Sequence, residues 1–84
     1  MNNPPELYWV IENRASFDRQ ARRRDPAACV LWVPGRPSEA WLAAVARLLS
    51  QAPAPARVSA DADPAGIEIA LAVGSLWAQQ GHEW

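Results

Sequence analysis

The sequence predicts an α/β fold in three layers, with a short parallel sheet and helices packed on its faces. Three short apolar runs alternate with three segments of helical character, the order typical of parallel strands joined by helical crossovers. The chain has 84 residues, of which 50% are hydrophobic and 20% are charged, so we expect one small folded domain over residues 1–84. The formal net charge of -1 provides no long-range attraction to nucleic acid or to acidic membranes.

The first strand is expected at Leu7–Ile11, a continuous apolar run rich in aromatic and β-branched residues. Such a run, without polar alternation, is typical of a strand that is buried on both faces. The polar segment that follows is compatible with a helix from residue 14 or 15 to residue 24. Asp25-Pro26 would end this helix, because a residue before proline disfavours helical geometry.

The second strand is expected at Cys29–Val33, where Pro34-Gly35 closes another apolar run. A helix over residues 38–51 follows, with either Pro37 or Ser38 at its start. This segment carries one apolar stripe at helical spacing, made of Trp41, Leu42, Val45, Leu48 and Leu49.

A weak third strand at residues 57–60 follows a stiff Ala-Pro connector and leads to the last helix. Asp63 is a good helix N-cap and Pro64 suits the first helical position, so this helix is expected from there to about Gly81. One of its faces carries Ile67, Ala70, Leu71, Gly74 and Trp77. Four tryptophans are expected in the core: Trp9, Trp32, Trp41 and Trp77.

The single cysteine, Cys29, excludes an internal disulfide and is expected to be a buried, reduced thiol. No apolar run approaches the roughly 20 residues that a membrane span needs. The first six residues lack the features of a signal peptide. We therefore expect a cytoplasmic protein with no membrane partner.

Three acidic residues are candidates for a metal site. Asp61 and Asp63 follow the third strand, and side chains two residues apart in a strand point to one side. Glu12 ends the first strand. If the strand order is 2-1-3, all three carboxylates meet at the switch point where such sheets bind ligands. Hard oxygen ligands beside a helix N-terminus predict a Mg²⁺ or Mn²⁺ site with a phosphate nearby.

These segments together resemble the Toprim domain, a Rossmann-like domain of topoisomerases, primases and related nucleases. Residues 61–69, DADPAGIEI, look like the D-x-D-P-x-G-x-x-I stretch of the topoisomerase VI A-subunit lineage. Residues 12–17, ENRASF, are similar to the E-N-x-x-[ST]-F segment of bacterial proteins related to JetD, the nuclease subunit of Wadjet anti-plasmid systems. Residues 34–38, PGRPS, resemble the Gly-containing loop after the second strand in that group. The resemblance extends from Leu7 to about Gly81.

The resemblance implies DNA phosphodiester cleavage in a plasmid-defence or DNA-processing protein. Asp61 and Asp63 would hold the divalent metal, and Glu12 would join them or act as general acid/base. The topoisomerase lineage also uses a catalytic Tyr on a separate domain, and Tyr8, inside the first strand, cannot take that role. We therefore expect a piece of a longer protein, truncated before a fourth strand. It would need further domains or subunits and be inactive or nearly so alone.

Several arginines are candidates for DNA contacts. Arg36 follows the second strand near the predicted site and is the preferred phosphate contact. Arg19 and Arg23 share one face of the first helix with Arg22, and this face could neutralise DNA phosphates or be plainly solvated. Glu68, early in the last helix, could reach the site or be solvated. An exposed sheet edge in a truncated domain would favour self-association.

A second hypothesis is a catalytically inactive Toprim-like module that docks DNA or another protein, with the acids serving as helix caps. The small size and the lack of positive charge favour it. Other acid-pair chemistries fit less well. A haloacid-dehalogenase-type phosphatase requires a hydroxyl or β-branched residue where this chain has Ala65, and it also requires a Lys, which the chain lacks. No dinucleotide-binding or Walker A motif is present.

Overall fold

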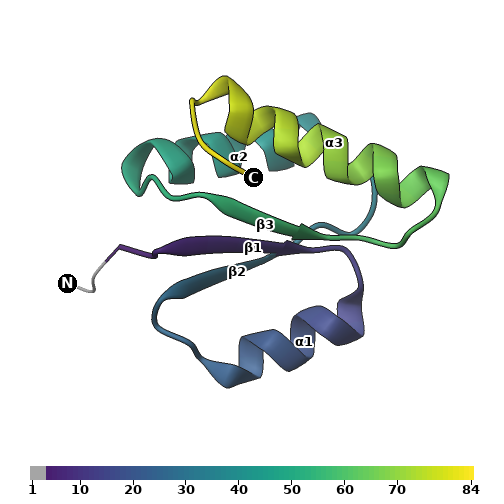
Figure 1. Ribbon diagram of the computed structural model, residues 1–84, viewed down its shortest axis with the longest axis horizontal. Coiled ribbons are helices and arrows are strands. Elements are labelled where there is room, and N and C mark those ends of the chain that lie inside the picture. Colours follow the sequence, from purple (N-terminus) through teal and green to yellow (C-terminus); the bar gives the residue numbers. More distant parts are fainter. Residues whose placement is uncertain (1–3) are drawn as a thin grey trace.

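Strands and helices alternate along the chain in the computed structural model, which describes residues 4–84 (Figure 1). The elements are β1 (Leu7–Ile11), α1 (Arg14–Arg23), β2 (Ala28–Trp32), α2 (Glu39–Gln51), β3 (Ala56–Ser59) and α3 (Pro64–Gln79). The sequence predicted each of these elements, with bounds that agree with the observed ones to within two residues and are identical for β1. Within residues 4–84, no helix combines the length and the apolar character that crossing a bilayer requires.

The three strands form one parallel sheet in the order β2-β1-β3, which confirms the predicted order. Leu7 of β1 pairs with Ala28 of β2, and Tyr8 of β1 pairs with Ala56 of β3. β1 is therefore the central strand, with a hydrogen-bonded neighbour on each side. This position explains why its residues are apolar without interruption.

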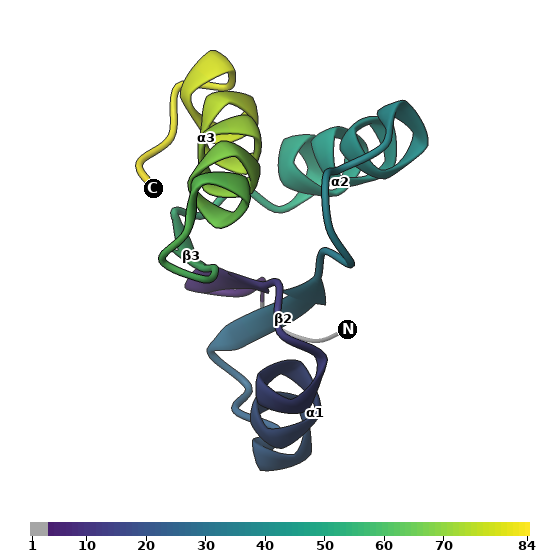
Figure 2. The same cartoon turned by 90° about the vertical axis from the view of Figure 1, so that its right-hand side faces the viewer.

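Helices cover the two faces of the sheet unequally. Helix α1 lies on one face, whereas α2 and α3 both lie on the other (Figures 1 and 2). The main hydrophobic core fills the space between the sheet and the pair α2 and α3. Its buried members are Tyr8, Val10, Val33, Val45, Leu49, Ala54, Ala56, Ile69, Val73, Leu76 and Trp77. Helix α1, by contrast, contains no fully buried residue.

Tyr8 and Trp77 occupy the centre of this core, and both are fully buried. Their rings meet edge to face with centroids 5.7 Å apart. The Tyr8 hydroxyl donates to the carbonyl oxygen of Ala52 at 2.6 Å, and Trp77 Nε1 donates to that of Ala54 at 3.0 Å. Both aromatic residues thus bury their rings and satisfy their polar atoms on the connector between α2 and β3.

The tryptophans are less buried than the sequence suggested. Trp77 is fully buried, but Trp9, Trp32 and Trp41 are only half-buried at the borders of the packed regions. Each of these three indoles donates its Nε1–H to an oxygen atom at 2.8 to 3.0 Å, respectively Ser59 Oγ, the Glu12 carbonyl and the Trp32 carbonyl. The polar N–H explains their positions, because an indole that is partly buried still needs an acceptor.

The buried face of α3 differs from the expected one. Ile67 and Leu71 are 56% and 54% exposed. The helix packs instead through Ile69, Val73 and Trp77, together with Gly66, Gly74 and Leu76. Because α3 is apolar on almost every side, hydrophobic periodicity alone could not identify the face that packs on the sheet.

The C-terminal residues fold back beside α3 and β3 (Figure 2). The Ala56 N–H donates to the Glu83 carbonyl oxygen at 2.9 Å. The Trp84 ring lies against Gly74 so closely that a Cβ at Gly74 would overlap it. Trp84 therefore packs on α3 while half of its surface remains exposed.

Candidate functional site

The carboxyl ends of β1 and β3 bring acidic residues from distant parts of the chain together. A carboxylate oxygen of Glu12, Oε1, accepts a hydrogen bond from the Asp61 N–H at 3.1 Å, across 49 residues of sequence. The Glu12 N–H in turn donates to the Ser59 carbonyl oxygen at 2.9 Å, which continues the ladder between the strands. Glu12 is half-buried and Asp61 is exposed. The strand order 2-1-3 thus brings Glu12 to the loop that carries Asp61, and the contact is made to the Asp61 main chain rather than to its carboxylate.

Asp63 has a structural role that the sequence predicted. It is the N-cap of α3, and its Oδ1 accepts from the Gly66 N–H at 2.7 Å. Pro64 occupies the first turn of the helix, as expected. Gly66 is required here because a Cβ at this position would overlap the Asp61 carbonyl oxygen. The acidic loop is therefore closely packed on the first turn of α3.

A small cavity of about 140 Å³ lies beside Asp61. Its lining residues come from the end of β1, the start of α1 and the end of β3: Ile11, Asn13, Ser16, Ser59, Ala60 and Asp61. Asn13 caps α1, because its Oδ1 accepts from the Ser16 N–H at 2.9 Å. Two helix N-termini, those of α1 and α3, thus begin at this edge, where their partial positive charge favours an anion.

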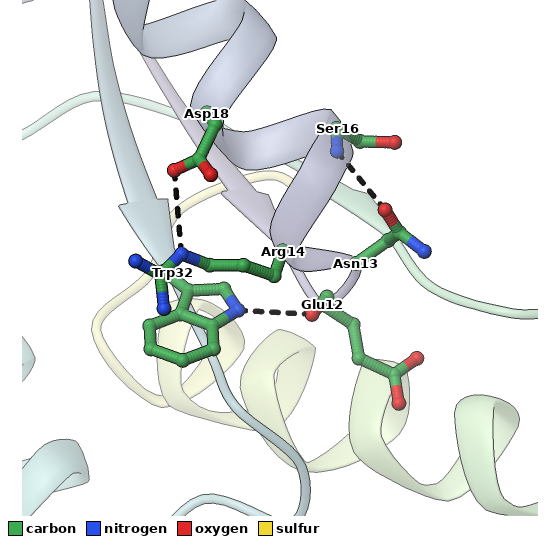
Figure 3. A network of polar contacts seen from close by, with 6 residues as sticks. All are labelled: Glu12, Asn13, Arg14, Ser16, Asp18 and Trp32. Carbon is green, nitrogen blue, oxygen red and sulfur yellow. Dashed lines mark hydrogen bonds and ion pairs between the residues drawn. The ribbon is translucent and has the colours of Figure 1, made fainter.

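Glu12 connects this edge to the region under α1 (Figure 3). Its main-chain carbonyl accepts from Trp32 Nε1 at 3.0 Å, while its carboxylate points away from Trp32. The Arg14 guanidinium carbon lies 4.7 Å from the centroid of the Trp32 ring, and Arg14 Nε is 3.3 Å from Asp18 Oδ1. The main chain of Glu12 is therefore fixed by a partly buried hydrogen bond, and its carboxylate remains at the edge of the sheet.

The three arginines that the sequence predicted as phosphate contacts lie in different surroundings. Arg36 forms an ion pair with Glu68 of α3, and both side chains are largely exposed. Arg19 donates to Ser16 Oγ at 3.3 Å, which places it one turn from the cavity. Arg23 lies in the last turn of α1, at the end of the helix away from the cavity. Of these three arginines, Arg19 is therefore the one linked to a cavity residue.

The fit of a divalent metal at this edge depends on Glu12 and on the two aspartates of the loop after β3. Within residues 4–84, no three His, Cys, Asp or Glu side chains are arranged as a metal-binding group. Glu12 and the Asp61 main chain are in contact, whereas the Asp63 carboxylate caps α3. A metal ion at this edge would have at most the Glu12 and Asp61 carboxylates as protein ligands, a number compatible with Mg²⁺, which completes its shell with water and phosphate oxygens.

Tyr8 and Cys29 do not belong to this edge. The Tyr8 phenol is buried in the core, and burial raises its pKa above the ordinary value of 10.0, with a further increase from the neighbouring Cys29. Burial also raises the pKa of the Cys29 thiol above 9.0. A thiol in this state is a poor nucleophile at neutral pH.

We compared the chain with known protein families, with curated proteins and with solved structures. None of the three comparisons gives a match.

The sequence did not single out the cavity residues Ser16 and Ser59 or the partner of Arg36. Asn13 entered only as part of the ENRASF segment, and its capping role depends on the helix start at Arg14. Ser59 had one available signal, because it precedes Asp61 by two residues and so lies on the same side of an extended chain. The pairing of Arg36 with Glu68 had no local signal, since 32 residues separate them.

Proposed function

We propose that this chain is the metal-binding part of a protein that cleaves DNA phosphodiester bonds. The observation that carries the proposal is the hydrogen bond from the Asp61 main-chain N–H to the Glu12 carboxylate, which brings the end of β1 and the loop after β3 together at the edge where such sheets bind ligands. The resemblance to Toprim domains supports it, because the acids of that pattern are the acids at this edge. We place the parent protein in bacterial plasmid defence or DNA processing, where further domains would position the DNA.

In this proposal the three acids have different roles. Glu12 and Asp61 supply carboxylate oxygens to Mg²⁺ or Mn²⁺, and Asp63 holds α3 in place as its cap. A bound metal would neutralise phosphate charge and activate a water molecule for attack. Glu12, whose main chain is fixed by two hydrogen bonds, is also suited to accept a proton from that water. The N-termini of α1 and α3 would favour the phosphate itself.

Calorimetric titration with Mn²⁺ tests this proposal. The wild type is compared with a Glu12→Gln, Asp61→Asn double variant, which keeps the size of both side chains and the hydrogen bond to the Asp61 main chain. A Glu39→Gln, Asp25→Asn variant is the matched control, because both acids are exposed and lie away from the cavity. We expect saturable binding in the wild type and in the control, and none in the Glu12, Asp61 variant.

A specific observation also favours the second candidate, an inactive Toprim-like module for docking DNA or another protein. Glu12 and Asp63 each use their carboxylate in a hydrogen bond to the main chain, so both acids already have a structural purpose. Equal weak Mn²⁺ binding in all three proteins would contradict the metal site and leave this candidate in its place.

A further inference from the structure

Part of the sheet face on the α1 side has no helix over it. In the described part of the chain, α1 contacts β2 and β1 but not β3. Trp9 of β1 and Arg57 of β3 are register partners, and Ser59 lies two residues beyond Arg57, on the same side of the strand. These three residues, Trp9, Arg57 and Ser59, form what we call the open face.

The open face is fixed by its own contacts. The Arg57 guanidinium carbon lies 5.3 Å from the centroid of the Trp9 ring, a cation–π distance. Trp9 Nε1 donates to Ser59 Oγ at 2.8 Å, which fixes the orientation of the indole. Arg57 itself is exposed, whereas Trp9 and Ser59 are half-buried. The guanidinium is thus held at a defined place above the sheet without being buried.

The open face leads directly to the candidate site. Ser59 accepts the hydrogen bond from Trp9 and also lines the cavity that Asp61 borders. Ser59 is therefore the residue shared by the open face and the cavity. A polymer whose phosphate sits at Glu12 and Asp61 would continue over Ser59 towards Arg57.

The charge of Arg57 is also uncompensated. Arg14 is paired with Asp18, and Arg36 is paired with Glu68. Within residues 4–84, no carboxylate lies within ion-pair distance of Arg57. A neutral indole holds this arginine, so its full positive charge and its N–H groups remain available to an anion.

We infer that the open face binds single-stranded DNA next to the scissile phosphate, with Arg57 as its phosphate contact and Trp9 as the residue that positions Arg57. The inference rests on the proposed function, because it takes the strand to pass through the carboxylate site. Arginine and tryptophan are also the side chains on which unpaired bases stack, so the same pair can hold a base beside the phosphate. With a net charge of -1, the chain must bind such a strand through local contacts of this kind.

Fluorescence anisotropy with a labelled oligothymidylate tests the inference. Arg57→Gln is compared with Arg47→Gln, a matched loss of one exposed charge on α2, on the opposite face of the sheet. We expect Arg57→Gln to weaken binding about tenfold, the scale of a lost charge-assisted hydrogen bond. Its slope of log affinity against log salt should fall by about 0.7, one phosphate contact to a single strand. Arg47→Gln should match the wild type in both measurements.

Variants of Trp9 separate positioning from direct contact. Trp9→Phe keeps an aromatic ring under Arg57, whereas Trp9→Leu does not, and near-ultraviolet circular dichroism checks that both variants fold. We expect Trp9→Phe to retain most of the binding and Trp9→Leu to resemble Arg57→Gln. Equal affinities and salt slopes for Arg57→Gln and Arg47→Gln would overturn the inference, as would a wild type that does not bind the oligonucleotide.

The two proposals can fail separately. Repeating the anisotropy in EDTA measures strand binding without metal, and the Mn²⁺ titration measures the carboxylate site without DNA. One outcome is that the titration supports the metal site while Arg57→Gln binds the oligonucleotide as Arg47→Gln does. In that case DNA binding by the open face is contradicted and the proposed function stands. If Mn²⁺ does not bind and Arg57→Gln alone weakens the oligonucleotide complex, the proposal of metal-dependent DNA cleavage is contradicted and strand binding by Arg57 stands.

Discussion

The two faces of the sheet are built in different ways. On the face covered by α2 and α3, apolar side chains from strands and helices pack together, and six large side chains are fully buried, whereas Ile11 is the one such side chain of β1 on the other face. On the other face, α1 contributes no fully buried residue and packs through contacts at Trp32, which Phe17 and Arg14 both approach. The difference indicates that α2 and α3 supply most of the stability, and that the α1 side keeps polar and aromatic groups available.

The largest effect should come from the centre of the packed face. Trp77→Ala removes a fully buried ring and its hydrogen bond, and such truncations cost about 3–5 kcal/mol. Native proteins have a total stability of roughly 5–15 kcal/mol, so this loss is a large fraction of the total. The free energy of unfolding in urea measures this effect. Leu71→Ala, on the exposed side of the same helix, should stay within about 0.5 kcal/mol of the wild type.

The next largest loss of stability is expected where the first turn of α3 packs on the loop that carries Asp61. Gly66→Ala places a Cβ on the Asp61 carbonyl oxygen, and main chain must move to relieve the overlap. We expect a loss of about 1–3 kcal/mol, together with weaker Mn²⁺ binding. Gly74→Ala is the control, because its Cβ meets the ring of Trp84, a half-exposed side chain that can rotate away. A Gly66→Ala protein as stable as Gly74→Ala would show that the acidic loop is not held by this close approach.

The smallest effect is a loss of stability at alkaline pH. Tyr8 and Cys29 are neutral when protonated, and burial raises both pKa values in the folded state. The unfolded chain therefore releases these protons first, so the stability that they contribute is complete below about pH 9 and is lost as the pH rises further. Urea midpoints from pH 7 to pH 10.5 measure it. Cys29→Ala should show a weaker decline, and an identical decline would mean that the thiol is not responsible.

Local patterns predicted the features that depend on neighbouring residues. Leu7–Ile11 was identifiable as a central strand because it is apolar on both faces, and Asp63-Pro64 marked the start of α3 through its capping chemistry. The strand order then placed Glu12 beside Asp61. The strand and the helix start were predictable because strand alternation and helix capping act over a few residues, whereas the approach of Glu12 to the Asp61 loop followed from the predicted strand order.

The features that were missed depend on residues distant in the sequence. Arg36 could not be assigned to Glu68, nor Arg57 to Trp9, because only the folded sheet brings them together. The packed side of α3 was ambiguous for another reason. Ile67 and Ile69 are equally apolar, and the helix turns Ile69 towards the sheet because β3 and α2 constrain its direction.

The central position of β1 has a consequence for how the chain folds. β1 precedes both of its partners, and its pairings with β2 and β3 span 21 and 48 residues, as in Leu7 with Ala28 and Tyr8 with Ala56. During synthesis at about 5–20 residues per second, this strand is made at least a second before β2 and longer before β3. Its sequence, LYWVI, is strongly β-forming and uncharged, the composition of segments that associate between chains. Early formation of α1 would therefore be the first local event able to shield β1 before the sheet assembles.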